Sequence, residues 1–546
     1  MAQLDPKILA IRLAKALSRK RLWNSIYDDA MRLSMPNRNS FSRVSRGARK
    51  DDLVFDSTLS TSRTRFANRL QTELFPIFQK WADLVPGKFV VMDEEELEEL
   101  KAVLRGIREV LFAAISVSNF DSVINEFLQD LGLGTGVFLI LEGDDIIPLR
   151  FVSVPLSQVA FEEGMWGTIG AVFHQVTIPQ GLLESMYEKL AFKNDDKPKD
   201  WDKIIADDRE KEVEVTSITY SDFVRQADGS FEWRYDVFAK VDATDSKSLG
   251  VRFVSETFPD NPWIVSRWSK LAGEDFGRGP IIDALPDAKT LNKVVELVLK
   301  NAALAISPPL TGVDDGSWNM NIAVVRPNVI IPVSSNAGGA RGPSLQPLLL
   351  QNNFNVADLI IEKLEIKIKK AMLDDQLPSE AGSVRSPTEI VERVRQLQQD
   401  IGAPFGRIHS EVLRPFIQRS INILLKKGVI QIEGVKRISV DGTGIEVRAI
   451  SRLARVQNLA EIEAAAQWLE LQRLLGDQAF DVNVNTENFG RWSADKLSVD
   501  PIIVRSVAEQ QEMIDAIRQA EADAAARQQQ QGLGTQQPEQ ALPIAS

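Results

Sequence analysis

The stretch that decides the fold starts with the sequence PIIDALPDAKTLNKVVELVLKNAALA at residues 280–305. Its small and apolar side chains recur every three or four residues, which predicts a helix with one apolar stripe. The stripe consists of Ala288, Leu291, Val295, Val298, Ala302 and Ala305. Pro280 suits the first helical turn, where its missing N–H needs no partner. We expect Pro286, inside the helix, to kink or restart it.

Two more helices follow this first one. The second is predicted at 354–374, with an apolar stripe made of Ala357, Ile360, Leu364, Ile368 and Ala371. The third begins at Ser386-Pro387-Thr388-Glu389, which has the pattern of a capping box, and Gly428 ends it. Gly402, Pro404 and Pro415 fall inside this third helix, so we expect it to bend near its middle.

The rest of the chain mixes helices and strands, so the predicted fold class is α+β. Residues 306–351 contain six prolines among short β-branched runs, which excludes a long helix and favours short strands. Further helices are predicted at 1–35, 57–75, from 93 onward, 121–131, 452–475 and about 500–527. Strands are predicted at 81–85 and 137–142, through most of 149–268, and at 429–450. The glutamine-rich end, 528–546, has the composition of a disordered tail.

Composition excludes several classes of site. The chain has 546 residues, a net charge of −12 and no cysteine, so disulfides and thiolate metal sites are absent. His174 and His409 are too far apart in sequence to suggest a metal cluster. The amphipathic N-terminus predicts a docked surface helix instead of a targeting peptide, and hence a cytoplasmic protein. The acidic balance argues against a tight DNA-binding protein and fits a wall past which DNA slides, although it is also ordinary for a soluble protein.

No motif predicts catalysis, a cofactor or a metal. A nucleotide-binding G-x-x-x-x-G-K-[ST] loop and a nucleophile elbow are both missing from the sequence. Three glycines at 132, 134 and 136 lie between a helix and a strand, the reverse of a phosphate loop, which predicts a structural turn. Asp144-Asp145 and Asp374-Asp375 occupy turn-like positions, which favours solvated loops over Mg²⁺ sites. The basic loop 36–54 is either solvated or in contact with an acidic neighbouring subunit or DNA.

Several ordered motifs carry a family resemblance. They include Arg267-Trp268, the run Gly273-Glu274-Asp275-Phe276-Gly277-Arg278-Gly279-Pro280, and Ala284-Leu285-Pro286-Asp287 followed by Leu291-Asn292-Lys293. Others are Thr388-Glu389-Ile390 before Arg393, Gly402, Glu411, Pro415 and Leu424, and Arg69-Leu70 before Leu74-Phe75-Pro76 and Trp81. In this order, over roughly residues 50–475, the chain resembles the head-to-tail connector, or portal, proteins of short-tailed bacteriophages.

The resemblance implies a portal-type subunit with helical stem, α/β wing, β-containing clip and helical crown. The implied parts are an N-terminal wing region (1–275), a first stem helix (276–305), a clip (306–351), a second stem helix (352–374), a tunnel loop (375–386), a long kinked helix with wing return strands (387–450), a helical crown (451–527) and the tail (528–546).

The implied function is a non-enzymatic dodecameric ring that forms the DNA channel at one capsid vertex. Such a ring serves head assembly, genome packaging, genome ejection and tail attachment. The implied partners are further copies of the chain, double-stranded DNA, the terminase motor, major capsid and scaffolding proteins, and tail adaptor or tail proteins. The implied location is the virion, after assembly in the host cytoplasm. The alternatives are a DNA-processing enzyme of the packaging apparatus and a head-completion or tail adaptor ring protein.

Two sets of residues are candidates for function. Candidate DNA-channel residues are Lys363, Lys367, Lys370, Arg385, Ser379, Glu380, Gly382 and Ser383. The three lysines fall on one helix face, which predicts either a solvated face or, in a ring, a circle of charge. Candidate ring-packing residues are Leu291, Val295, Val298, Ile360, Leu364 and Ile368, because one helix pair leaves its outer faces unburied.

Overall fold

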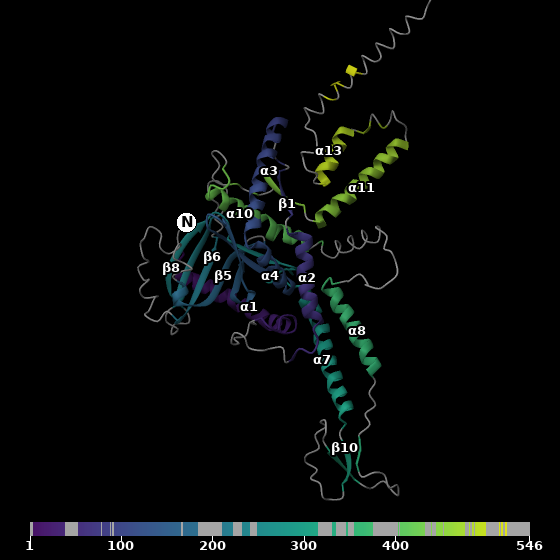
Figure 1. Cartoon of the computed structure of the whole chain (residues 1–546). Coiled ribbons are helices and arrows are strands. Elements are labelled where there is room, and N and C mark those ends of the chain that lie inside the picture. Colours follow the sequence, from purple (N-terminus) through teal and green to yellow (C-terminus); the bar gives the residue numbers. More distant parts are fainter. Residues whose placement is uncertain are drawn as a thin grey trace, which may run out of the picture. The chain divides into compact units, whose positions relative to one another are not determined.

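The structure of the chain is a computed structural model (Figure 1). It describes residues 4–38, 53–77, 79–87, 89, 92–164, 167–183, 210–221, 232–240, 248–308, 310–314, 330–334, 345–347, 354–374, 402, 404–431, 438, 440, 444–450, 452–474, 480, 483–484, 486–497, 513, 515–516 and 519–520. These residues form two compact units, Met1–Ser451 and Arg452–Ser546. Among them, no helix combines the length and the apolar character that crossing a lipid bilayer requires.

A five-stranded antiparallel sheet dominates one side of the first unit (Figure 1). Its strands, in spatial order, are β4 (Val159–Glu163), β5 (Ile169–Pro179), β6 (Glu212–Tyr220), β7 (Trp233–Lys240) and β8 (Val251–Phe258). The N-terminal helix α1 (Pro6–Ser34) packs on this sheet, with Leu9, Leu13 and Ala16 in one buried cluster with Phe173 and Phe238. Because α1 presents apolar residues every three or four positions, it buries one face here.

A second, three-stranded sheet has the order β3 (Leu149–Ser153), β2 (Thr135–Glu142), β9 (Trp263–Arg267). The helices α2 (Thr58–Leu74) and α4 (Phe120–Leu133) pack against each other, and α4 packs on this sheet. Phe127 of α4 meets Phe138 of β2 edge-to-face at 5.0 Å, one of several aromatic contacts in this core. A 3₁₀ turn at Leu156–Gln158 leads from β3 to β4.

A third pairing joins distant parts of the chain. Strand β1 (Ala82–Pro86) pairs antiparallel with β13 (Ile445–Ala449), and α3 (Glu94–Val117) packs beside β1. Helix α10 (Arg414–Lys426) follows a π-helical turn at His409–Leu413. Phe416 of α10 lies 5.7 Å from Trp81 and 5.1 Å from Phe120 between ring centroids. Aromatic packing therefore fixes the end of the long third helix to the body of the unit.

Two helices and a small sheet form a separate arm of the first unit. Helix α7 (Pro280–Ile306) leads to β10 (Leu310–Asp314), β11 (Ile330–Ser334) and β12 (Leu345–Pro347), and α8 (Phe354–Ala371) returns beside α7 (Figure 1). Strand β10 is central, parallel to β11 and antiparallel to β12. The predicted proline-rich strand segment between two helices is thus confirmed for these strands.

The second unit contains α11 (Arg452–Leu474) and α13 (Thr486–Leu497), which pack together. An ion pair of 2.5 Å joins Lys496 Nζ to Glu461 Oε2. The sequence analysis predicted α11 but did not predict α13.

Most predicted helices of the first unit are confirmed, within a few residues at each end. Helix α7 is continuous across Pro286, so this proline does not restart it. Gly428 lies just after the end of α10. Its φ of 70° is the left-handed conformation that often terminates a helix and that glycine adopts readily. The described part of the third helix contains a π-helical turn at His409–Leu413, and the predicted bend near its middle stays a prediction. Its predicted capping box at 386–389, and the predicted helix at about 500–527 and tail at 528–546, fall largely or wholly outside the described residues.

Candidate assembly and channel surface

Four glycines lie where the segment before α7 packs against the end of α4, and we call them the glycine clasp. They are Gly132, Gly134, Gly277 and Gly279. A Cβ atom on Gly277 would lie 2.2 Å from the carbonyl oxygen of Gly134, and one on Gly279 would lie 2.2 Å from that of Gly132. Gly134 also has φ of 135°, which side chains rarely adopt. The segment before α7 therefore lies backbone to backbone against the end of α4, and the predicted structural turn is confirmed.

Hydrogen bonds from two other elements complete the clasp. The Thr135 Oγ1 of β2 accepts from the Gly277 N–H at 2.9 Å, and the Tyr27 hydroxyl of α1 donates to the Gly277 carbonyl at 3.0 Å. Tyr27 is fully buried, and this burial raises the pKa of its hydroxyl, which stays a donor. The clasp joins α1, α4, β2 and α7 in one place.

A second set of contacts fixes the first half of α7. The Asn292 Oδ1 accepts from the backbone N–H of Phe55 at 2.7 Å, and its Nδ2 donates to the Leu53 carbonyl at 3.0 Å. Lys289 forms an ion pair with Asp29 of α1. Because Asn292 and Lys289 both belong to the first half of the helix, that half is bound to the body of the unit.

The second half of α7 and the facing helix α8 keep large apolar side chains in solvent. Six such residues are between 52% and 86% exposed: Leu297, Leu299 and Ile306 on α7, and Val356, Leu359 and Ile366 on α8. One exposed leucine needs no explanation, but six large exposed apolar side chains on two helices are more than a surface usually carries. Leu297 and Leu299, two residues apart, face different sides of α7, so the six do not form a single patch.

The six residues predicted to pack in a ring divide into two groups. Leu291, Leu364 and Ile368 are buried within the single chain, where α7 and α8 meet each other and the body. Val295 and Val298 are half-buried, and Ile360 is 41% exposed. The second group leaves area for another chain, and the role of all six residues in a ring stays a prediction.

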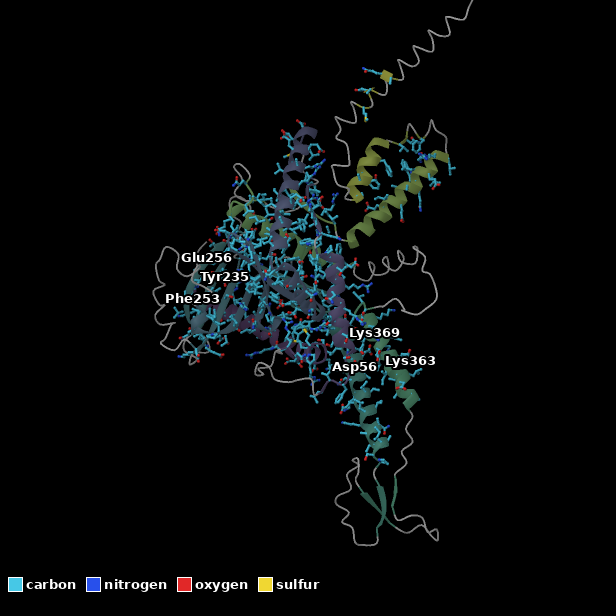
Figure 2. The ribbon with its side chains drawn as sticks, in the orientation of Figure 1. Asp56, Tyr235, Phe253, Glu256, Lys363 and Lys369 are labelled. Atoms are coloured by element: carbon cyan, nitrogen blue, oxygen red, sulfur yellow. The ribbon has the colours of Figure 1, made fainter. Side chains whose placement is uncertain are left out.

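The three candidate channel lysines, Lys363, Lys367 and Lys370, are exposed on α8. Figure 2 labels Lys363 and Lys369 on this helix. None of the three has an ion pair with a described residue, whereas Lys369 pairs with Glu365 at 2.9 Å. On α7, by contrast, Lys293 and Lys300 both pair with Glu296 and lower the pKa of that carboxyl. Within the described part of the helix pair, the lysine row without ion pairs therefore lies on α8.

The C-terminal end of α8 is anchored on α2. The buried Asp374 carboxylate accepts from Ser62 Oγ at 2.8 Å and from Arg65 Nη1 at 3.3 Å. Arg69 Nη1 donates to the carbonyl of Leu373, which has φ of 55°. The predicted solvated loop at Asp374 is therefore wrong: this aspartate is 8% exposed and pairs with a neighbouring helix, a partner that local sequence cannot reveal.

The remaining channel candidates lie outside the described residues. These are Ser379, Glu380, Gly382, Ser383 and Arg385, together with Asp375. Their place at the channel stays a prediction. The structure shows that the chain is anchored to α2 at Asp374, directly before this loop begins.

Exposed apolar side chains on a helix pair beside an anchored body are typical of a chain that packs against other chains. A sequence model described as "Bacteriophage head to tail connecting protein" matches residues 7–504, and the chain belongs to this family.

Curated relatives agree with that assignment. The portal protein of Escherichia phage T7 is 21% identical over 488 residues, covering 86% of this chain and 83% of the relative. The probable portal protein of Bordetella phage BPP-1 is 20% identical over 537 residues, covering 92% and 89%. The chain is accordingly a portal, or head-to-tail connector, protein of the bacteriophage type.

Among solved structures, the neck of an empty gene transfer agent particle matches 75% of this chain and 90% of its own chain, with 12% identity and a TM-score of 0.30. The virion of a native gene transfer agent particle matches 80% and 93%, with 10% identity and a TM-score of 0.31. These scores are too low to support an argument about the fold.

Proposed function

We propose that this chain forms a dodecameric ring at one capsid vertex and that the ring is the channel through which double-stranded DNA enters and leaves the head. The observation that carries the proposal is the exposed apolar surface on α7 and α8. Burying one large aliphatic side chain stabilises a contact by roughly 1.5–3 kcal/mol. Six such residues, repeated around a ring, supply a strong driving force for assembly.

In this arrangement the second half of α7, with Val295 and Val298, and the outer face of α8, with Ile360, pack against neighbouring copies. Leu291, Leu364 and Ile368 support the same contacts from inside each chain. A ring of this kind seeds head assembly in the host cytoplasm and binds the capsid and scaffolding proteins through its outer surface.

The small sheet β10–β12, at the far end of the helix pair, would then be the clip that docks the terminase motor and later the tail proteins. The support is its place in the chain, since α7 leads to it and α8 returns from it (Figure 1). In sequence, these strands lie midway between the anchored start of α7 and the anchored end of α8.

The lysine row on α8 and the loop after Asp374 would face the DNA. Lys363, Lys367 and Lys370 would contact phosphates without reading bases, and such contacts weaken as salt rises. Ser379, Glu380, Gly382, Ser383 and Arg385 would touch the DNA weakly from the tunnel loop. The net charge of −12 supports weak contact instead of tight binding.

Substitution of the exposed leucines tests the ring contact. Leu299→Asp and Leu359→Asp should abolish rings and leave folded monomers, because both side chains are already in solvent within one chain, at 53% and 52% exposure. Leu182→Asp is the matched control, because Leu182 is 52% exposed on a different element. Particle size is measured by light scattering and electron microscopy, and folding by circular dichroism. Normal rings from both leucine variants would refute the contact.

A further inference from the structure

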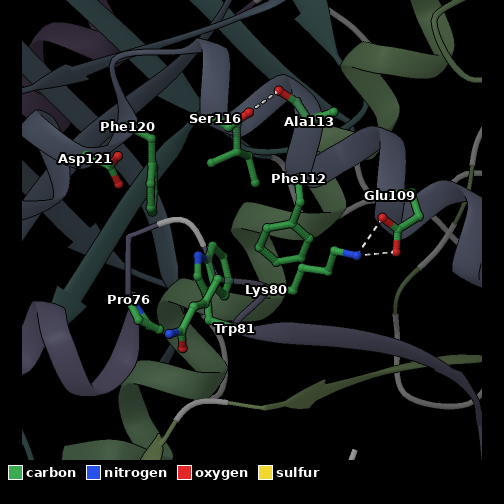
Figure 3. A pocket seen from close by; sticks show the side chains of 11 residues that line it. Pro76, Lys80, Trp81, Glu109, Phe112, Ala113, Ser116, Phe120 and Asp121 are labelled. Carbon is green, nitrogen blue, oxygen red and sulfur yellow. Dashed lines mark hydrogen bonds and ion pairs between the residues drawn. The ribbon is translucent and has the colours of Figure 1, made fainter. Parts of the chain in front are cut away.

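A pocket of about 340 Å³ opens between the start of β1, the end of α3 and the first turn of α4 (Figure 3). Its floor is aromatic: the Trp81 ring lies 5.1 Å from the Phe112 ring and 5.9 Å from the Phe120 ring, between centroids. The volume is at the lower end of the range of about 300–1,000 Å³ that ligand pockets occupy. The site is therefore large enough for a single side chain and part of its neighbour.

Two carboxylates line the pocket, and they differ in their partners. Glu109 is paired through both oxygens with Lys80 at 2.6 Å and through one oxygen with Arg108 at 3.1 Å, so its charge is fully compensated. Asp121 lies across the aromatic rings from this pair (Figure 3). Its carboxylate has no ion pair or hydrogen bond with any described residue, and Gln71 bonds only its backbone carbonyl. Of the two lining carboxylates, Asp121 is thus the one without a cationic partner among the described residues.

The Asp121 side chain is exposed at the edge of the pocket. Partial desolvation raises the pKa of its carboxyl. Its place in the first turn of α4 still favours the ionised form. A cation that enters the pocket would compensate the negative charge of the Asp121 carboxylate.

We propose that this pocket binds an arginine side chain of a partner protein, with the guanidinium against Asp121 and over the aromatic floor. A guanidinium is planar, stacks on aromatic faces and donates two parallel hydrogen bonds to a carboxylate. A purely apolar side chain would desolvate Asp121 further without a partner for it. A nucleic acid would place phosphates beside Asp121 and Glu109, which repel them.

Two exposed apolar residues adjoin lining residues in sequence. Ile77 follows Pro76 and Val117 follows Ser116, and they are 47% and 57% exposed. We expect an apolar residue next to the arginine in the partner to pack on one of them. The proposal does not depend on ring formation, because all of these groups belong to one chain.

The absence of native cysteine makes a direct test possible. Ser116→Cys places a unique thiol at the pocket, since the chain has no cysteine and Ser116 is exposed. The intact protein is equilibrated, under mild reductant, with three disulfide reagents of equal length that end in a guanidinium, a urea or an ammonium group. Intact mass gives the fraction of each adduct. Gln79→Cys, at another lining position, repeats the test from a second attachment point.

We expect the guanidinium adduct to exceed the urea adduct at least fivefold, and to exceed the ammonium adduct. Asp121→Asn should reduce the first ratio to near one. Glu99→Gln, which removes an exposed carboxylate elsewhere on α3, should leave it unchanged. Equal guanidinium and urea adducts from both attachment points, or an unchanged ratio in Asp121→Asn, would overturn the proposal. An equal ammonium adduct would refute the assignment to arginine.

Discussion

Gly277→Ala should be among the most damaging small substitutions in this chain. The new Cβ would lie 2.2 Å from the Gly134 carbonyl oxygen and 2.9 Å from the Arg267 Cβ. Ordinary van der Waals contact requires the first separation to grow by about 1 Å. The atoms that the new methyl group would meet are a backbone oxygen and the Cβ of Arg267. Neither is the end of a flexible side chain, so neither can move aside easily. We expect a loss of about 3 kcal/mol, at the upper end of the usual range for overpacking.

Two other glycines distinguish the effect of steric overlap from the effect of backbone conformation. Gly106, inside α3, has no atom within 4 Å of the position that an alanine methyl group would occupy, so Gly106→Ala should stabilise α3 by about 0.5–1 kcal/mol. Gly273 also has open space but φ of 86°, so Gly273→Ala tests the conformational cost alone, about 1–2 kcal/mol.

Amide hydrogen exchange is the suitable assay, because a chain with two compact units does not unfold as one two-state system. Gly277→Ala should raise exchange in the first turn of α7, in β9 and at the end of α4, with little change in the five-stranded sheet. If Gly277→Ala exchanges no faster at these amides than Gly106→Ala, the close backbone contact at the clasp is refuted.

Three further predictions concern charged side chains. Asp374→Ala should speed amide exchange in the last turn of α8, with a local loss of about 1.5–3 kcal/mol, because the buried Ser62 hydroxyl loses its acceptor; unchanged exchange there would contradict the anchor. Burial lowers the pKa of Lys20 to about 7, so the unfolded state binds more protons between pH 7 and 10.5, and stability should rise with pH across that window. Lys20→Met should therefore raise the melting temperature most near pH 6, with a difference that shrinks toward pH 10; a difference that stays constant with pH would contradict the lowered pKa of Lys20. Replacing Lys363, Lys367 and Lys370 together by Gln should leave rings intact and change DNA packaging or retention, and full heads with normal retention would favour a solvated lysine face.

The sequence predicted the helices well where their apolar pattern was regular. The observed bounds of α7, Pro280–Ile306, differ from the predicted 280–305 by one residue, because Pro280 and the stripe mark both ends. The family resemblance was confirmed by the head-to-tail connecting protein model and by two portal proteins.

Contacts between distant segments could not be predicted in this way. Asp374 looked like a loop residue because its partners, Ser62 and Arg65, are more than 300 positions away in sequence. The same holds for the pairing of β1 with β13 and for the role of Asn292 as a bridge to residues 53–56. Glycine spacing did signal a turn at Gly134, but not that Gly277 is its counterpart.

Leu364 shows a further limit. Its position on an apolar stripe predicted contact with a second copy; within the single chain it is already only 9% exposed, and the contact with a second copy stays a prediction. Periodicity says which face of a helix is apolar, but it does not distinguish a neighbour in the same chain from one in another chain.

Electron microscopy of the purified protein tests the central claim most directly. The account predicts closed rings in which the exposed leucines of α7 and α8, Leu297, Leu299 and Leu359, lie at the contact between adjacent copies, and in which the α8 lysines face a central channel. Monomers at high protein concentration, or rings whose contacts leave these leucines in solvent, would contradict it.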